Sequence, residues 1–370
     1  MNSKLKRITL PLLSFVTLVA MACTCAGLGA AEPTPTPEPP PTKAPTKVPP
    51  TKPVIASPTD TPEVNIGGDG DVSITIAADP FVHASGAFSI RLPEGWEIDE
   101  RNYSVGAFEG GGASVQMYFD NVGVGFDAAT RDKYIQSIEA NFYGAYDNYQ
   151  LSSQEEQQDG SIGVFKTIDL DNVPFHISTY YWQAGTVMYI QDMWIPEAQY
   201  DSYIDPLLEV ANSVTVDETA GGNAALFPLR YTFTGPNGLF EFQIPYGWEY
   251  TTGSAENTMV DTFKAPDGHS YIDNLVYDDG KEISRSAAGQ VALNLLKVFY
   301  ADDLSVVDDQ VQADGSERLS WRSNGKGIIG QTFFEVRGTT FLLLTWVVEN
   351  DFYDFNQPIW ADVLGSYKAP

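Results

Sequence analysis

Alternating apolar and polar positions recur in two stretches of this chain, and each stretch ends in the same kind of corner. The segments "AFSIRL" at 87–92 and "LFEFQI" at 239–244 lead into Pro-Glu-Gly-Trp and Pro-Tyr-Gly-Trp. A period of two is typical of a strand with one buried face. A proline then ends the ladder of hydrogen bonds, and a glycine permits the turn. We therefore expect Trp96 and Trp248 to plug the core at a structural corner of each half.

The similarity between the two halves extends beyond this corner. Residues 86–97 and 238–249 are identical at six of twelve positions. Further matches follow in the same order, such as "QQDGS" at 157–161 with "QADGS" at 312–316. Ordered matches of this kind predict duplication of a whole domain. The polar, glycine-containing segment 217–226 is the expected linker between the copies.

A helical period follows in the middle of each half. Residues 127–146 and 284–301 are predicted to be helices because apolar residues recur every three or four positions. Asp127 is the expected N-cap of the first helix. The predicted apolar faces are Tyr134, Ile135, Ile138 and Phe142 in the first helix and Val291, Leu295, Val298 and Phe299 in the second.

Strand patterns return after each helix and lead to a last helical segment. Apolar runs separated by tight turns indicate antiparallel strands, and the Gly-Thr pairs at 185–186 and 338–339 suit hairpins. The closing segments 197–214 and 351–367 each contain a proline, so we expect each helix to kink or start late. One antiparallel sheet with packed helices satisfies this order in each half, which predicts the α+β class.

This order of elements, with the Pro-x-Gly-Trp corner at its start, resembles the PsbP-like domains of the Mog1/PsbP group. The resemblance covers residues 72–216 and 227–369. It implies two tandem α/β/α sandwich domains and a fold that is used for protein contacts rather than for catalysis. The group shares no catalytic motif, so the resemblance assigns no catalytic residue.

The N-terminal residues have the three parts of an export signal. Basic residues precede an apolar run from Ile8 to Ala22, which is shorter than the roughly 20 residues that span a bilayer as a helix. Residues 1–22 are therefore predicted to be a cleaved signal peptide. "Ala-Met-Ala-Cys" resembles the lipobox of bacterial lipoproteins, with alanine where leucine is usual, which makes Cys23 the expected lipidation site. Cys25 is a weaker candidate, and an ordinary secretory signal is the alternative.

Proline dominates the segment between this signal and the first repeat. Residues 31–62 hold 12 of the 24 prolines. Because proline fixes φ and removes a donor, residues 23–66 are expected to form an extended linker rather than helix or sheet. The globular part is strongly acidic, with 45 acidic and 15 basic residues over 65–370. This charge argues against nucleic acid as a partner.

Residues suited to chemistry are sparse. The histidines His83, His176 and His269 match neither a metal-ligand spacing nor a catalytic triad pattern. We expect His176 to be structural or on the surface and His269 to be exposed in a turn. No Gly-x-Ser-x-Gly elbow and no phosphate-binding loop occur.

Acid-rich turns and aromatic residues are the remaining candidates. The turns could supply oxygen ligands to Ca²⁺, although solvated turns are the simpler interpretation. Their acids are Asp69, Asp71, Asp169, Asp171, Asp278, Asp279 and Glu282. Core packing is expected for most of the aromatic residues. These are Tyr180, Tyr181, Trp182, Trp194, Phe333, Phe334, Trp346 and Trp360.

Together these features predict an exported lipoprotein, held to the membrane by its lipid on the extracytoplasmic side. Its two domains are expected to act as a non-catalytic binding or assembly module for a protein partner in the cell envelope, without a cofactor or metal. The alternative is an extracytoplasmic hydrolase or glycan-binding protein that uses acidic and aromatic residues in a cleft. A hydrolase would require at least two carboxylates converging in a pocket with raised pKa values.

Overall fold

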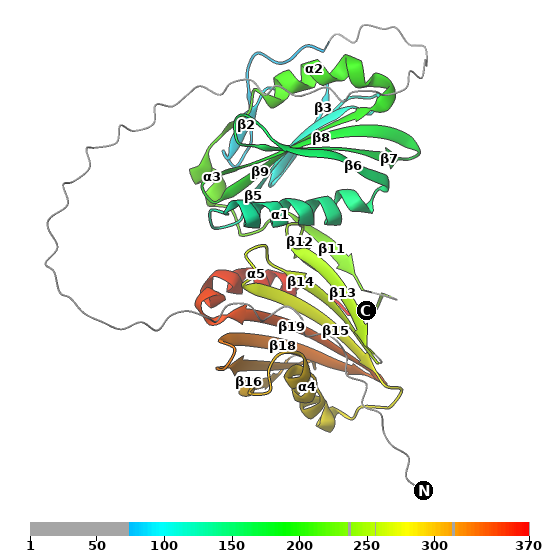
Figure 1. Cartoon of the computed structure of the whole chain (residues 1–370), viewed down its shortest axis with the longest axis vertical. Helices are drawn as coiled ribbons and strands as arrows, with labels where there is room; N and C mark the ends of the chain where they lie inside the picture. Colours follow the sequence, from blue (N-terminus) through cyan, green and yellow to red (C-terminus); the bar gives the residue numbers. More distant parts are fainter. Residues whose placement is uncertain (1–73, 236–237, 256, 313–314, 370) are drawn as a thin grey trace, which may run out of the picture. The chain divides into compact units, whose positions relative to one another are not determined.

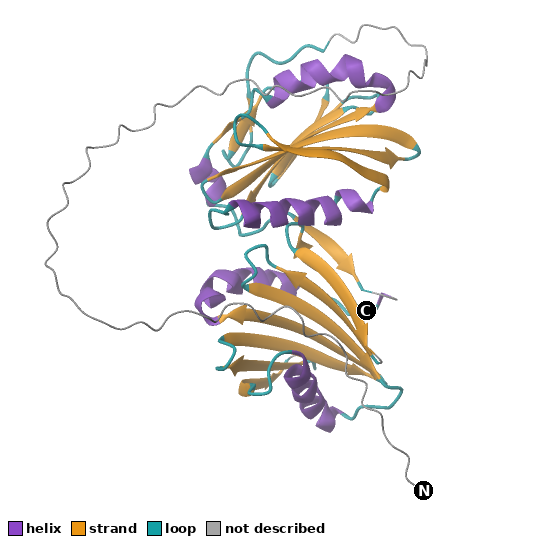
Figure 2. Ribbon diagram, viewed as in Figure 1, coloured by secondary structure: helices purple, strands orange, loops and turns teal. Residues whose placement is uncertain are grey.

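The computed structural model describes residues 74–235, 238–255, 257–312 and 315–369. The predicted signal peptide, Cys23, Cys25 and the proline-rich linker lie outside these residues. The described part contains two domains, each built on an antiparallel sheet of seven strands (Figures 1 and 2).

The two large sheets have the same strand order. In domain 1 the order is β3-β4-β5-β9-β8-β7-β6, and in domain 2 it is β13-β14-β15-β19-β18-β17-β16. The domain 1 strands are β3 (Glu97–Arg101), β4 (Ser104–Phe108), β5 (Ser114–Asn121), β6 (Asp147–Glu156), β7 (Ile162–Leu170), β8 (Val173–Ala184) and β9 (Val187–Pro196). The domain 2 strands are β13 (Glu249–Ala255), β14 (Thr258–Lys264), β15 (Ser270–Asp278), β16 (Ser305–Val311), β17 (Glu317–Ser323), β18 (Ile328–Arg337) and β19 (Thr340–Glu349). This shared order confirms the α+β class and the two-domain organisation.

Helices cover both faces of each sheet. In domain 1, α1 (Ala128–Asn141) covers one face and α2 (Tyr200–Ala211) the other (Figure 1). Strand β9 shows the alternation, because Ile190 packs with the α1 cluster and Met193 with the α2 cluster. A small sheet of β1 (Phe81–Val82), β2 (Phe88–Ile90) and β10 (Thr215–Val216) adjoins α2. Domain 2 has α4 (Arg285–Phe299), α5 (Tyr353–Ser366) and the pair β11 (Arg230–Thr234) and β12 (Glu241–Pro245).

The middle helices test the predicted apolar faces. In α1 the Asp127 side chain accepts a hydrogen bond from the Thr130 amide, which confirms the N-cap. Of the predicted face, Tyr134, Ile135 and Ile138 are buried.

The predicted face of α4 is wrong for two of its four residues. Val291 and Leu295 are partly buried and pack against the core cluster under the helix. Val298 is 80% exposed and Phe299 is 42% exposed, whereas Ala288, Ala292 and Leu296 are buried. The buried face packs in one cluster with the large side chains of β17 and β18, including Trp321 and Phe334. Small alanines let the helix backbone lie close to these rings, so side-chain volume and not hydrophobicity alone selected the inner face.

The closing helices do not start late at their prolines. Each begins with a single 3₁₀ turn, η2 (Glu197–Gln199) or η4 (Asn350–Phe352), and α2 and α5 follow directly. Pro206 and Pro358 lie inside these helices. Each proline removes one backbone donor from its helix, but neither delays the start.

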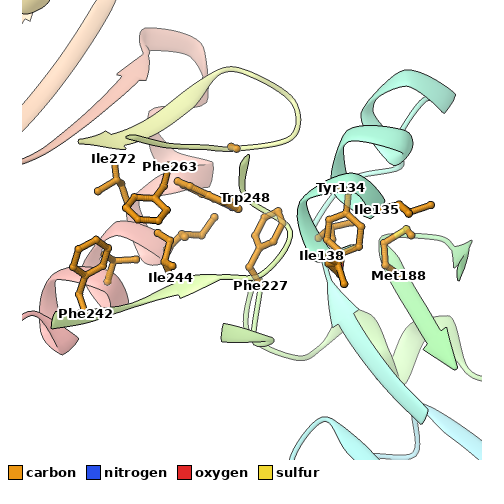
Figure 3. Packing of buried hydrophobic residues seen from close by; sticks show 14 of the residues in the cluster. Tyr134, Ile135, Ile138, Met188, Phe227, Phe242, Ile244, Trp248, Phe263 and Ile272 are labelled. Carbon is orange, nitrogen blue, oxygen red and sulfur yellow. The ribbon is translucent and has the colours of Figure 1, made fainter. Parts of the chain in front are cut away.

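The two Pro-x-Gly-Trp corners use their glycine differently. Gly95 has a φ of +79°, a region that glycine adopts readily. Gly247 is needed for space, because a Cβ there would lie 2.3 Å from the ring of Tyr134. Trp248 is buried and packs against Phe227, so its predicted core role is confirmed (Figure 3). Trp96 is only half-buried.

The expected linker at 217–226 is held by specific hydrogen bonds. Asp217 caps the short helix α3 (Glu218–Gly222) by accepting from the backbone amides of Thr219 and Ala220. The amide of Asn121, at the end of β5, donates to the carbonyls of Gly222 and Ala224 at 3.0 and 2.8 Å. This segment therefore contacts the domain 1 sheet directly.

Candidate functional site

A groove of about 430 Å³ lies over β13, β14 and β15, beside the C-terminal end of α4. Hydroxyl groups, aromatic rings and one carboxyl line it. The lining residues that matter here are Thr251, Thr258, Thr262, Tyr271, Asp273 and Tyr300.

Strand register places these polar side chains on one face of the sheet. Thr251 pairs with Thr262 across β13 and β14, and Thr262 pairs with Asp273 across β14 and β15. Directly opposite residues in paired strands point to the same face. Their neighbours Phe263 and Ile272 point the other way, into the core under α5 (Figure 3). A plain alternation of polar and apolar residues thus builds the floor of the groove.

Asp273 is the only carboxyl group among the groove's lining residues. It accepts hydrogen bonds from the Thr262 hydroxyl at 2.6 Å and from the Tyr300 hydroxyl at 2.7 Å. Burial raises the pKa of Asp273, and these two hydrogen bonds oppose the shift. Burial and the nearby Asp273 charge likewise raise the pKa of Tyr300 well above its usual value. The site can bind a hydrogen-bonding group and an apolar group. Among its described lining residues, Asp273 has no second carboxyl beside it of the kind used by two-carboxylate hydrolases.

Two exposed apolar residues lie at the C-terminal end of α4, and one of them lines this groove. Val298 is the most exposed large apolar side chain of α4, and Phe299 lines the groove itself. Exposed apolar groups that are contiguous with a groove are typical of an interaction surface. We call the groove and these two residues the α4 groove.

Domain 1 holds a different polar cluster between α1 and its sheet. Lys166 of β7 donates to Glu139 of α1 at 2.7 Å and to Thr179 of β8 at 2.8 Å. Its ammonium group lies 3.3 Å from the centre of the Tyr143 ring. The Tyr143 hydroxyl in turn lies 2.6 Å from both carboxylate oxygens of Asp192 in β9. We call these residues, with Tyr181, the Lys166 cluster.

Burial governs the electrostatics of the Lys166 cluster. The pKa of Lys166 is lowered by burial, against the attraction of Glu139 and Asp192. The pKa of Asp192 is raised by burial, against Lys166 and the Tyr143 hydrogen bond. Tyr181 donates to Glu139 at 2.8 Å. Two carboxylates therefore do converge in domain 1, around a lysine and not around an open groove.

The sequence contains a signal for this cluster that the search for motifs missed. In "IGVFKTIDL", alternation places Lys166 in the same set as Ile162, Val164 and Ile168, which are all buried. A lysine in the inward register of an apolar strand requires a buried partner. Asp192 lies in the same way within the apolar strand "VMYIQDMWI".

The histidines occupy three unrelated places. His83 is buried and its Nε2 bonds the Arg101 carbonyl at 2.7 Å. His176 is half-buried beside Tyr200, in keeping with a structural role. His269 was predicted to be exposed, but its ring stacks on Phe352 at 3.7 Å and leaves it half-buried.

The acid-rich turns make local hydrogen bonds. Asp278 accepts from the Gly280 amide, and Asp279 pairs with Lys281 at 3.0 Å. Asp169 accepts from the Asn148 side chain. Asp69 and Asp71 lie outside the described residues. Within the described ranges, no group of three or more His, Cys, Asp or Glu residues could hold a metal ion.

Most of the aromatic candidates pack in the core, as predicted. Trp182 and Phe333 are half-buried, and the remaining six are buried: Tyr180, Tyr181, Trp194, Phe334, Trp346 and Trp360. No helix in the described part of the chain is both long and apolar enough to cross a membrane.

No family model and no curated protein matches the chain. Among solved structures, the chain is similar to cyanobacterial PsbP from Synechocystis sp. PCC 6803, at 12% identity and a TM-score of 0.32, over 40% of this chain and 96% of that one. It is similar to the Ran-binding protein Mog1p of Saccharomyces cerevisiae, at 10% identity and a TM-score of 0.32, over 40% of this chain and 99% of that one. It is similar to the immunity protein TplEi of Pseudomonas aeruginosa, at 10% identity and a TM-score of 0.22, over 78% of this chain and 96% of that one. The fold class rests on the strand order and helix placement given above.

Proposed function

We propose that this protein is an exported lipoprotein, anchored by lipid on Cys23, whose two PsbP-like domains form a non-catalytic protein-binding or assembly module at the cell surface. The α4 groove is the proposed contact surface. The observation that carries this proposal is that Phe299, which is exposed and follows the exposed Val298 in the chain, lines the groove.

The C-terminal end of α1 in domain 1, which is equivalent to that of α4, indicates what kind of segment could bind the α4 groove. There the side-chain amide of Asn141 donates to the carbonyls of Tyr246 and Trp248, each at 2.8 Å. The ring of Phe142 lies 5.4 Å from that of Tyr246. A corner turn that carries an aromatic residue thus covers the end of α1. We expect the end of α4 to receive a turn with an aromatic or apolar side chain from another protein.

Site-directed crosslinking tests this surface. A photoreactive residue is placed at Phe299 in the full-length protein in its native membrane, with Val82, which is 63% exposed in domain 1, as the matched control position. We expect one discrete crosslinked protein from position 299 and none from position 82. Addition of Val298→Asp should remove the product. Equal labelling from both positions would contradict the proposed contact surface.

The anchor is tested separately. Cys23→Ser is expected to move the protein from the membrane fraction to the soluble fraction, because acyl chains supply most of the membrane affinity. Cys25→Ser is the control and should leave the protein on the membrane. A Cys23→Ser protein that stays membrane-bound would point to Cys25 or to an uncleaved signal.

A glycan is the second candidate ligand. The α4 groove combines threonine hydroxyls, one carboxyl and the rings of Tyr271, Phe299 and Tyr300, a combination that can bind the hydroxyls and the apolar face of a sugar. This alternative is tested by adding envelope glycans to the protein and measuring the protein's intrinsic fluorescence. Saturable binding that is lost in Asp273→Asn would favour a glycan over a protein partner.

A further inference from the structure

Lys166 and Glu139 form an ion pair in the interior of domain 1. The Lys166 side chain is fully buried and the Glu139 side chain is 10% exposed. A buried ion pair is costly because both charges lose their hydration, and the attraction between them restores this only when every remaining donor and acceptor is satisfied. A chemical change that removed both charges would relieve this cost.

The amine and the carboxyl are already in contact. Lys166 Nζ lies 2.7 Å from Glu139 Oε1, so the carboxyl carbon is only one bond further away. The Thr179 hydroxyl and the Tyr143 ring hold the amine from two other directions. Such a fixed pair of reactants has a very high effective concentration, on the order of 10⁵ M or more in well-oriented cases.

A proton path leads away from the amine. Thr179 accepts from Lys166 at 2.8 Å and donates to the Tyr143 hydroxyl at 3.2 Å. Tyr143 donates to Asp192 at 2.6 Å. Burial lowers the pKa of Lys166 and raises that of Asp192. The first shift favours the uncharged amine that attacks a carboxyl carbon, and the second makes the Asp192 carboxylate a stronger acceptor for the proton that the amine releases.

We propose that Lys166 and Glu139 become joined by an intramolecular amide bond. One proton moves from Lys166 Nζ to Glu139 along their 2.7 Å hydrogen bond, which gives an amine and a carboxylic acid. The amine then attacks the carboxyl carbon, and a bond forms between Nζ and Cδ. One further amine proton passes through Thr179 and Tyr143 to the Asp192 carboxylate, and one proton returns along the same hydrogen-bonded chain to the Glu139 hydroxyl as it departs. The Cδ–O bond breaks and one water molecule leaves. Amine and acid give amide and water, so no oxidant or other co-reactant is needed.

The surroundings favour the product. The amide is neutral and keeps one N–H and one C=O, so Thr179 and Tyr181 retain hydrogen-bonding partners. The interior excludes the water that would reverse the reaction, because Tyr143, Thr179 and Tyr181 are all buried. The chain has no cysteine after Cys25, so this bond would provide a covalent link that a disulfide cannot supply here.

Trypsin digestion and intact mass test the bond directly. The sequence has no Lys or Arg between Lys133 and Lys166, or between Lys166 and Arg230. An unmodified chain therefore releases peptide 134–166. Trypsin does not cleave after an acylated lysine, so the amide-linked chain gives peptide 134–230, lighter by one water molecule. We expect this linked peptide and the same mass deficit in the intact protein. Full intact mass with complete release of peptide 134–166 would overturn the proposal.

Variants separate the bond from the fold. Lys166→Met and Glu139→Ala should each show the full mass expected from sequence, whereas Lys133→Met, an exposed residue of the same helix, should keep the deficit. Where either variant fails to fold, Lys166→Arg keeps the charge and cannot form this bond. A deficit that persists in Lys166→Arg would place the linkage elsewhere and overturn the proposal.

Asp192 is assigned a positioning and proton-transfer role. In Asp192→Asn, with folding verified by circular dichroism, we expect the linked fraction in freshly made protein to form roughly a hundredfold more slowly. A variant that forms the bond at the wild-type rate would remove Asp192 from the mechanism.

Discussion

The helix-facing cores of the two domains share a backbone plan but differ in charge. Thr179 pairs with Asp192 across β8 and β9, and Thr332 pairs with Thr345 at the same register across β18 and β19. Lys166 bonds the threonine in domain 1. In domain 2 that place belongs to Trp321, whose Nε1 donates to the Thr332 hydroxyl at 3.0 Å.

The acid also changes strand between the domains. Domain 1 has Asp192 on β9, while domain 2 has Asp273 on β15, directly opposite Thr345. The Trp321 ring stacks on Tyr300 at 5.3 Å where the Lys166 ammonium lies over Tyr143. A cluster of hydroxyls, rings and the Asp273 carboxyl, here called the Trp321 cluster, therefore supports the same fold without a lysine. The buried Lys166–Glu139 pair of domain 1 is not required by the architecture, which makes it a candidate for a specific role.

The largest effect is expected from the Trp321 cluster of domain 2. Trp321→Ala should destabilise domain 2 by about 4 kcal/mol, because a fully buried indole and its hydrogen bond are lost. Denaturant unfolding is the measurement, with Val311→Ala as control at a 73% exposed position. A loss below about 1 kcal/mol would show that the surrounding helix and sheet collapse onto the site.

The charged cluster should respond differently to single and double substitution. Lys166→Met is expected to cost about 3 kcal/mol, since it leaves the Glu139 carboxyl buried without its partner. The double variant Lys166→Met/Glu139→Leu should be more stable than the single variant, because neither variant can form the amide bond and only the single variant keeps an unpaired buried carboxyl. Calorimetric unfolding of both variants decides the point. A double variant no more stable than the single one would mean that the charges are required for packing.

The stability of domain 1 is expected to depend on pH because of Asp120. Burial raises the pKa of Asp120 to about 7, against the hydrogen bond that Tyr134 donates at 2.7 Å. The unfolded value is about 4, so the folded state binds more protons between these two values, and stability falls as the pH rises from about 4 through 7.

Asp120→Asn should remove this fall. Relative to wild type, the variant is expected to gain a few kcal/mol between about pH 4 and pH 8. Chemical unfolding at several pH values across this window measures the difference. Parallel curves for the two proteins would show that Asp120 ionises as freely in the folded state as in the unfolded one.

The smallest difference in stability is expected between variants of the two Pro-x-Gly-Trp corners. Gly247→Ala should cost about 2 kcal/mol, because its Cβ would press on the Tyr134 ring. Gly95→Ala should cost about 1 kcal/mol through its positive φ alone, since its Cβ would meet no other atom within 4 Å. Paired thermal unfolding compares them. Equal losses would indicate that backbone conformation, and not contact with Tyr134, explains both glycines.

Much of the fold could be predicted because repetition and alternation are local signals. The duplicated corner, the N-cap at Asp127 and the buried face of α1 follow from residues close together in the chain. The inner face of α4 could not be predicted in this way. Its choice of Ala288 and Ala292 over Val298 depends on the rings of Trp321 and Phe334, which lie on strands distant in sequence.

The candidate sites, like the helix faces, could be predicted only where local sequence signals were enough. By itself the sequence predicted two similar halves, the α+β class and the scarcity of histidine and cysteine chemistry, because composition and period do not depend on distant contacts. Only the tertiary structure brought Lys166, Glu139 and Asp192 together and placed Asp273 beneath Tyr300. Each of these groups comes from a different element, and only packing sets the burial that makes a lysine or an aspartate unusual.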